Sequence, residues 1–142
     1  MEALHECAKR NLSLVSVDSY EKNNEFVKLL QRRFGKYVYK RDLEICYVVS
    51  FSTLGGGRDL WIGGSVSTSE NNERKFVWAS HGKTFDFTHW QDGEPNNLGG
   101  DQPCVHTWSI SNDFRWADGQ YYLKYGYICE ETTSLYKCWG TL

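Results

Sequence analysis

The chain contains 142 residues, 40% of them hydrophobic and 15% aromatic, and its 16 basic and 18 acidic residues give a net charge of −2. This length suits one domain with a real core, and the near-neutral charge argues against a broad nucleic-acid-binding surface. No apolar run approaches the roughly 20 residues that a membrane span needs. The first ten residues are charged and helix-like, so they predict no secretory signal peptide.

The first quarter of the sequence predicts two helices. A short helix is expected at the start, where apolar residues share one face: Ala3, Leu4, Cys7 and Ala8. The stretch Asn11–Val17 alternates like a strand edge or an extended turn. Asp18 and Glu21 form a capping-box pattern, which predicts a second helix over Ser19–Phe34. Its expected buried stripe is Phe26, Val27, Leu30 and Phe34.

After the second helix the pattern changes to strands. The stretch Gly35–Gly57 has a strand-like apolar middle, Ile45–Phe51, between a basic stretch and a glycine run. Short strands joined by polar turns follow, at Leu60–Ile62, Phe76–Trp78, Cys104–Ile110, Phe114–Trp116 and Tyr127–Glu130. Helices first and short strands later predict an α+β domain. Trp61, Trp78 and Trp116 are expected to be buried aromatics rather than ligand-stacking ones.

The five cysteines lie far apart, with no Cys-x-x-Cys pair that would indicate zinc or a dithiol redox site. Such dispersion suits disulfides in a secreted domain, but an odd number leaves one thiol unpaired or intermolecular. Because no signal peptide is predicted, either the start of the chain is incomplete or the thiols are reduced in the cytosol.

The segment GEPNNLGGDQPC, Gly93–Cys104, has two interpretations. Its glycine, proline, asparagine and aspartate residues are typical of a polar surface turn. Alternatively, the oxygen atoms of Glu94, Asn96 and Asp101 converge on one point, as a hard cation such as Ca²⁺ requires.

Several motifs in succession resemble the C-type lectin domain family. They are the N-terminal ALHECAKRNLSLVSV, then WIGG (Trp61–Gly64), GEPNN (Gly93–Asn97), CV (Cys104–Val105), FRWAD (Phe114–Asp118) and YICE (Tyr127–Glu130). The spacing resembles secreted insect lectins most, so the family implies an extracellular protein. The resemblance implies an α+β C-type lectin-like fold over residues 1–134, with two helices on short antiparallel strands, a long loop region and a tail over 135–142.

Two parts of the chain depart from the family pattern. The family's strand before the first helix is missing, so the sheet edge beside the last strand is expected to be open. The stretch Gly35–Gly57 has no counterpart, and we expect it to lie outside the core. The family also implies a disulfide between Cys7 and Cys129. The partner that it implies for Cys104 is absent, which leaves either pairing with Cys138 or a free thiol.

The resemblance further implies Ca²⁺-dependent recognition of a mannose-type sugar on a glycan or glycoprotein. The implied calcium ligands are Glu94, Asn96, Asp101, Gln102 and Asp118. Of these, Glu94, Asn96 and Asp118 would also contact the sugar, and a cis bond before Pro95 would turn the first two toward the ion. Two departures weaken this site, because Gln102 replaces a glutamate and Ala117 replaces an asparagine. The alternative is a lectin-like domain that binds protein without an ion; the oligomeric state stays open.

The sequence offers little support for an enzyme. Three histidines are scattered through its second half: His81, His89 and His106. A contact between Cys104 and His106 would lack an orienting third group and an oxyanion site. No feature sets one carboxyl group apart as the acid of a glycosidase pair. We therefore predict a non-enzymatic binding domain.

Overall fold

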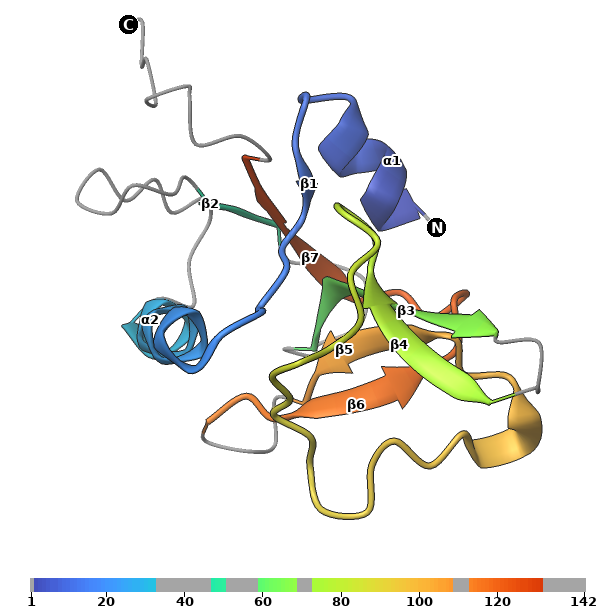
Figure 1. Ribbon diagram of the computed structural model, residues 1–142. Helices are drawn as coiled ribbons and strands as arrows, with labels where there is room; N and C mark the ends of the chain where they lie inside the picture. Colours follow the sequence, from blue (N-terminus) through green and yellow to red (C-terminus); the bar gives the residue numbers. More distant parts are fainter. Residues whose placement is uncertain (1, 33–46, 51–58, 69–72, 109–112, 132–142) are drawn as a thin grey trace, which may run out of the picture.

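The computed structural model describes residues 2–32, 47–50, 59–68, 73–108 and 113–131. Within these residues the chain forms two α-helices, one seven-stranded sheet and a short 3-10 turn (Figure 1). The helices are α1 (Glu2–Ala8) and α2 (Tyr20–Arg32), and the 3-10 turn is η1 (Leu98–Gly100). The strands are β1 (Ser13–Leu14), β2 (Tyr47–Ser50), β3 (Leu60–Thr68), β4 (Arg74–Trp78), β5 (Cys104–Thr107), β6 (Trp116–Gly119) and β7 (Gly126–Glu130). The predicted α+β class is confirmed.

The two helices begin close to where the sequence predicts them. In α1, Ala3 and Cys7 are buried. Helix α2 begins at Tyr20, and the Ser19 hydroxyl caps it by accepting the Lys22 amide at 3.2 Å. The predicted cap at Asp18 is therefore wrong by one residue, because Ser19 stands directly before the first helical residue. The buried face of α2 consists of Phe26, Leu29 and Leu30, with Val27 partly buried, while Phe34 lies outside the described residues.

The sheet joins both ends of the domain. Its main path is β1-β7-β3-β5-β6, and β4 pairs with β3. Strands β7 and β3 run parallel, whereas the other neighbouring pairs are antiparallel. Strand β6 starts at Trp116 rather than at the predicted Phe114, because Phe114 has a φ of 51°, which breaks an extended strand. Figure 1 shows the helices beside β1, β2 and β7, and the long loop beside β3 to β6.

The predicted long-range disulfide is present. Cys7 of α1 and Cys129 of β7 are bonded, with Cα atoms 5.5 Å apart and 122 residues between them in sequence. Both cysteines are fully buried. The bond fastens the first helix to the last strand, and this confirms the family alignment at both ends of the domain.

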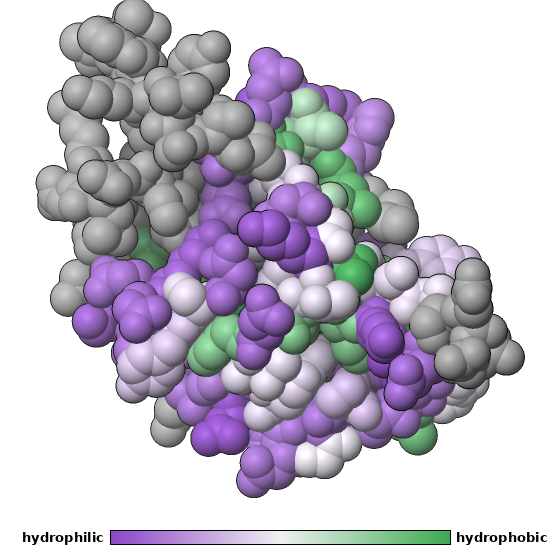
Figure 2. All heavy atoms as spheres, in the orientation of Figure 1, coloured by the Kyte–Doolittle hydropathy of each residue, from purple (hydrophilic) through white to green (hydrophobic). Residues whose placement is uncertain are grey.

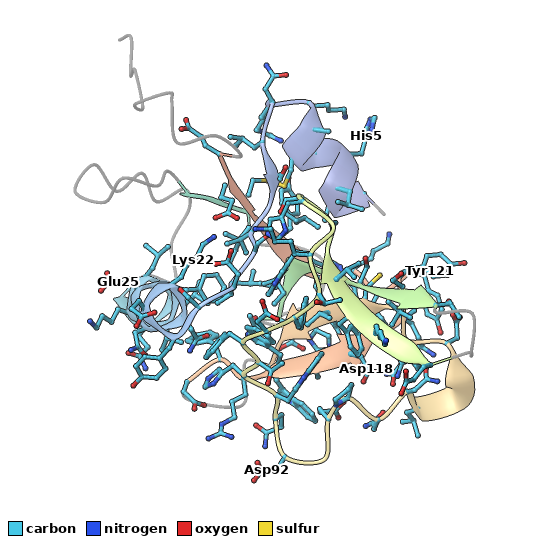
Figure 3. The ribbon with its side chains drawn as sticks, in the orientation of Figure 1. His5, Lys22, Glu25, Asp92, Asp118 and Tyr121 are labelled. Carbon is cyan, nitrogen blue, oxygen red and sulfur yellow. A yellow bond between two sulfur atoms is a disulfide. The ribbon has the colours of Figure 1, made fainter. Side chains whose placement is uncertain are left out.

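A second tie between the helices and the sheet is ionic. The Glu130 carboxylate on β7 accepts the Ser16 amide at 2.8 Å and pairs with Lys22 of α2 at 2.8 Å. Figure 3 shows Lys22 directed from α2 toward the sheet. Burial raises the pKa of Glu130, while Lys22 counteracts the rise. This ion pair therefore fixes α2 beside β1 and β7.

The stretch Gly35–Gly57 is only partly as predicted. We expected it to lie outside the core, and we expected the edge of β7 to be open because the family's strand before the first helix is missing. Instead, Tyr47–Ser50 form β2 and pair antiparallel with β7. Because β1 occupies the opposite edge of β7, β2 covers the edge that was expected to be free. The expectation of an open edge is wrong, and the rest of the stretch lies outside the described residues.

An aromatic core lies beneath the long loop. Trp78 and Trp116 are 1% and 0% exposed and meet edge to face, with ring centroids 5.6 Å apart. Phe85 stacks on Trp78 at 4.1 Å, and Trp90 meets Trp116 at 5.8 Å. Trp61, 7% exposed, packs elsewhere against His106 and Tyr125. The prediction that Trp61, Trp78 and Trp116 are buried is confirmed.

The β2 strand leads to the first testable prediction. The Ile128 carbonyl accepts the Val15 amide, so the backbone N–H and C=O of Ile128 face the β1 side of β7. Backbone groups of successive residues in a strand face opposite sides, so those of Cys129 face β2, where Val48 lies opposite. Val48→Pro removes the amide that faces β7, and we expect it to lower the free energy of unfolding by about 1–3 kcal/mol. Urea unfolding measures this change, and Val48→Thr, which keeps the amide and the branched side chain, is the control.

Size-exclusion chromatography provides a second measurement for the same variant, because an uncovered strand edge pairs with other chains. Equal stability of Val48→Pro and Val48→Thr would show that β2 contributes nothing to the sheet.

A second prediction concerns His106. Its ring, on β5, packs against the rings of Trp61 and Tyr125. Burial lowers the pKa of His106, although the Thr107 carbonyl and Asp59 oppose this effect. The unfolded chain therefore takes up this proton at a higher pH than the folded domain. The contribution of neutral His106 to the free energy of unfolding is fully present above about pH 6.5, the ordinary pKa of histidine. It is lost as the pH falls toward the lower folded-state pKa.

We expect His106→Gln to weaken this acid dependence, which for one histidine reaches at most about 1.4 kcal/mol per pH unit. Urea unfolding from pH 7.5 to 5 measures the slope, with the exposed His81→Gln as the control. Identical slopes for His106→Gln and the unmodified protein would contradict the prediction.

Candidate functional site

The Glu94-Pro95-Asn96 segment lies in the long loop between β4 and β5. The peptide bond between Glu94 and Pro95 is cis, as the family resemblance implies. Trp90 forms an isolated bridge to Trp116, and the Trp116 carbonyl accepts the Gln91 amide at 2.8 Å. The loop is therefore attached to the aromatic core just before the Glu94-Pro95-Asn96 segment. Asn97 then adopts a left-handed φ of 48° and leads into η1.

The side chains of Glu94 and Asn96 contact each other. The Asn96 Nδ2 donates to Glu94 Oε1 at 2.7 Å, and the Asn96 Oδ1 accepts the Leu98 amide at 2.8 Å. A hydrogen-bond acceptor and a hydrogen-bond donor thus lie side by side at the surface of the loop. The family resemblance implied that both side chains contact calcium and the sugar.

Asp118 of β6 lies at the base of the loop. Its side chain is 0% exposed, and Figure 3 shows it inside the domain, whereas Asp92 lies at the outer edge of the loop. Asp118 Oδ1 accepts the Asn96 amide at 3.0 Å, and its Oδ2 accepts the Asn97 amide at 3.0 Å. The Arg74 guanidinium also donates to Oδ2, at 2.9 Å. The structure thus brings Asp118 together with Glu94 and Asn96.

The other predicted site residues lie around this group. Gln102 contributes its backbone amide to Asn97 Oδ1 at 3.2 Å, and its side-chain oxygen accepts the Leu98 amide. Asp101 follows η1 and is exposed. Ala117 is 3% exposed and pairs with His106 in the sheet, so it brings only a methyl group to this position.

The electrostatics of the site favour a cation. Burial raises the pKa of Glu94, and the neighbouring Asp118 carboxylate raises it further. Two acidic side chains at close range repel each other unless positive charge lies between or beside them. Arg74 provides one such charge. Sequence reasoning missed this residue, because its partner Asp118 is 44 residues away.

Carboxylate and amide oxygens are the donors that Ca²⁺ prefers. Glu94, Asn96 and Asp118 supply such oxygens. Glu94 Oε1, Asn96 Oδ1 and Asp118 Oδ1 retain acceptor capacity, whereas Asp118 Oδ2 already accepts both the Asn97 amide and the Arg74 guanidinium. Among the described residues, no three His, Cys, Asp or Glu side chains gather as a metal site. A calcium ion held by these side chains would find two carboxylates and one amide, which is fewer oxygen ligands than the roughly six to eight that it usually binds.

Cys104 is a free half-buried thiol among the described residues, while Cys46 and Cys138 lie outside them. Burial raises the pKa of Cys104, so the thiolate is a minor form at neutral pH. This environment is the reverse of the one that activates a cysteine nucleophile.

Two further surface features lie near the site's supporting elements. A cleft of about 420 Å³ borders β4 and the long loop and is lined by Lys75, Phe76, Thr84, Phe85, Thr88 and Trp90. Large apolar side chains are exposed at Leu98, Tyr121 and Tyr122. On the face shown in Figure 2, the coloured residues are mostly hydrophilic or neutral, with hydrophobic ones in small separate areas.

The fold agrees with the comparisons to known proteins. Residues 1–131 match the family described as the lectin C-type domain. The chain therefore belongs to the C-type lectin domain family, which is non-enzymatic. The family's proteins are typically secreted or extracellular. Within the described residues, no helix is long and apolar enough to cross a membrane.

The chain is also similar to individual lectins. The chain is 32% identical over 131 residues to lectin subunit alpha of Sarcophaga peregrina, covering 91% of this chain and 39% of that protein. It superposes on the mouse scavenger receptor C-type lectin carbohydrate-recognition domain with a TM-score of 0.62 at 21% identity, covering 91% of this chain and 78% of the other. The chain spans about half, or less, of the length of the curated relatives it matches.

A second structural neighbour was determined in the presence of an oligosaccharide. It is the cow C-type carbohydrate-recognition domain of CD23 in the presence of GlcNAc2Man3 oligosaccharide, with a TM-score of 0.57 at 22% identity. The superposition covers 90% of this chain and 75% of the cow domain's chain. At these identities the two structural comparisons establish the fold, and this confirms the predicted C-type lectin-like architecture.

The burial of Asp118 gives a third prediction. Asp118→Asn replaces one acceptor oxygen by a donor, which then faces an amide or the Arg74 guanidinium. We expect the free energy of unfolding to fall by about 1–3 kcal/mol, the cost of an unsatisfied buried polar group. Urea unfolding in the presence of a chelator measures it. The control is Asp92→Asn, whose side chain is 93% exposed, and an equally small effect of both changes would contradict the prediction.

Proposed function

We propose that this domain binds a mannose-type sugar of a glycan or glycoprotein through the Glu94-Pro95-Asn96 loop, together with one Ca²⁺ ion. The observation that carries the proposal is the convergence of Glu94, Asn96 and Asp118 at one end of the sheet. Family membership supports carbohydrate as the class of ligand.

The geometry of the loop suits two neighbouring hydroxyl groups. The Asn96 amide donates to the Glu94 carboxylate at 2.7 Å, so donor and acceptor face each other at the surface. A sugar with two adjacent hydroxyls can replace this contact, because one hydroxyl accepts from Asn96 and the other donates to Glu94. Reversing the donor and the acceptor would favour a different arrangement of hydroxyls, which is the physical basis of the proposed preference.

The residues that would hold calcium are Glu94, Asn96 and Asp118, with Asp101 and Gln102 beside them. When bound, the ion would supply a positive charge with open coordination positions for hydroxyl oxygens. The protein's own residues orient the sugar. Asp118 holds the backbone of Asn96 and Asn97, and the loop then presents the side chains of Glu94 and Asn96. As for most members of the family, we propose an extracellular location.

Binding of a protein partner without an ion is the second candidate function. It is favoured by the apolar side chains exposed at Leu98, Tyr121 and Tyr122, which are 72%, 51% and 58% exposed. Aromatic residues are enriched in protein interfaces, and Leu98 lies directly after the Glu94–Asn97 segment. On this alternative, the loop would bind its partner equally well in a chelator.

Calorimetry with methyl mannoside and methyl galactoside tests the proposal. In the presence of Ca²⁺ we expect weak mannoside binding that a chelator abolishes. The double variant Glu94→Gln and Asn96→Asp exchanges donor and acceptor sides, so its preference should move toward galactoside by roughly tenfold, about the worth of one hydrogen bond.

The matched control is Asp92→Asn, which changes an exposed acidic residue of the same loop and should leave both affinities unaltered. Absence of sugar binding by the unmodified protein in millimolar Ca²⁺ would overturn the proposed function and leave the protein-binding alternative.

A further inference from the structure

We propose that Arg74 is an internal cation that holds the Glu94–Asn97 loop in its binding conformation without calcium and weakens the affinity of the site for the ion. This inference deepens the proposed function and rests on it for the identity of the competing ion. It concerns a residue of β4, outside the loop and outside the set of ligands that the sequence suggested.

The contacts of Arg74 fasten the loop at two points. Its Nη2 atom donates to Asp118 Oδ2 at 2.9 Å and to the Gln102 carbonyl at 2.6 Å. Asp118 in turn holds the amides of Asn96 and Asn97, whereas Gln102 lies five residues after Asn97. One guanidinium nitrogen therefore connects the Glu94–Asn97 loop, through Asp118, to the chain that follows it.

The environment fixes the position of the guanidinium. The Asp118 side chain is 0% exposed and the Arg74 side chain is 27% exposed, so solvent screens this pair less than a surface ion pair. The Arg74 guanidinium carbon lies 5.3 Å from the centroid of the Phe76 ring, on the same strand. Phe76 itself packs against Trp90 at the edge of the aromatic core.

The charges define the competition. Glu94 and Asp118 together carry two negative charges when both are ionised, and Arg74 neutralises one of them in place. An incoming Ca²⁺ must share the Asp118 carboxylate with a positive group that already occupies Oδ2. The guanidinium thus takes the place of the ion in holding the loop. Because like charges at this range repel, it also makes the free energy of Ca²⁺ binding less favourable.

Amide hydrogen exchange measured by NMR in a chelator tests the clamp. In the unmodified protein the amides of Asn96 and Asn97 should be protected without calcium. In Arg74→Met they should exchange roughly tenfold faster or more, because a charge-assisted contact that orients Asp118 is lost. Millimolar Ca²⁺ should restore their protection in this variant, since the ion then takes the position of the missing charge.

The matched control is Lys75→Met, which removes the neighbouring positive charge on the same strand, where the side chain is 56% exposed. It should leave loop exchange unchanged. The β7 amides report global folding, and if Arg74→Met fails to fold, Arg74→Gln makes the same comparison with a neutral donor. Three results would each overturn the inference: an unprotected loop in the unmodified protein in chelator, a protected loop in the Arg74 variant, or a loop that calcium does not restore.

Calorimetry with CaCl₂ alone gives the second readout. Arg74→Met should bind Ca²⁺ about tenfold more tightly than the unmodified protein, as expected when a like charge is removed beside the ion. Equal or weaker affinity would overturn the competition. Methyl mannoside is added only afterwards, so tighter calcium binding without sugar binding would sustain the role of Arg74 and refute the proposed function.

Discussion

A carboxylate shielded from water requires donors on every side, and Asp118 finds three donors on two separate segments of the chain. Two are consecutive loop amides, and the third is the guanidinium of Arg74. Because leaving such a group unsatisfied is costly, the loop and β4 are held in one arrangement relative to β6. The orientation of Glu94 and Asn96, and hence any recognition at this surface, depends on that arrangement.

Asp118 can impose this constraint because β6 is rigidly supported. Its first residue, Trp116, is fully buried and contacts Trp78, Phe85 and Trp90 edge to face. Trp90 belongs to the loop itself, so the same aromatic group supports the strand and the start of the loop. Polar groups at the surface are thus positioned by apolar packing below them, which explains how a loop with little regular structure keeps a defined shape.

The opposite end of the domain is fixed in a comparable way. The buried Glu130 joins α2 to β7 through Lys22, and a disulfide joins α1 to the same strand. Strand β7 therefore receives both helices, together with β1 and β2 on its two edges. The edge strand comes from a segment in which the sequence analysis identified no family motif. Backbone pairing needs only an extended chain of suitable length and position.

The sequence alone determined the features that depend on local pattern or on motif order. It predicted the α+β class, both helices, the buried tryptophans, the Cys7–Cys129 pair and the candidate loop at Glu94–Asn96. Only the tertiary structure decided the roles of Arg74 and β2. In the sequence, Arg74 is one of 16 basic residues, with nothing to distinguish it. Only the fold brings its Nη2 atom within 2.9 Å of Asp118 Oδ2. Contacts between distant residues leave no periodic trace in a single sequence, since they depend on the packing of the whole chain.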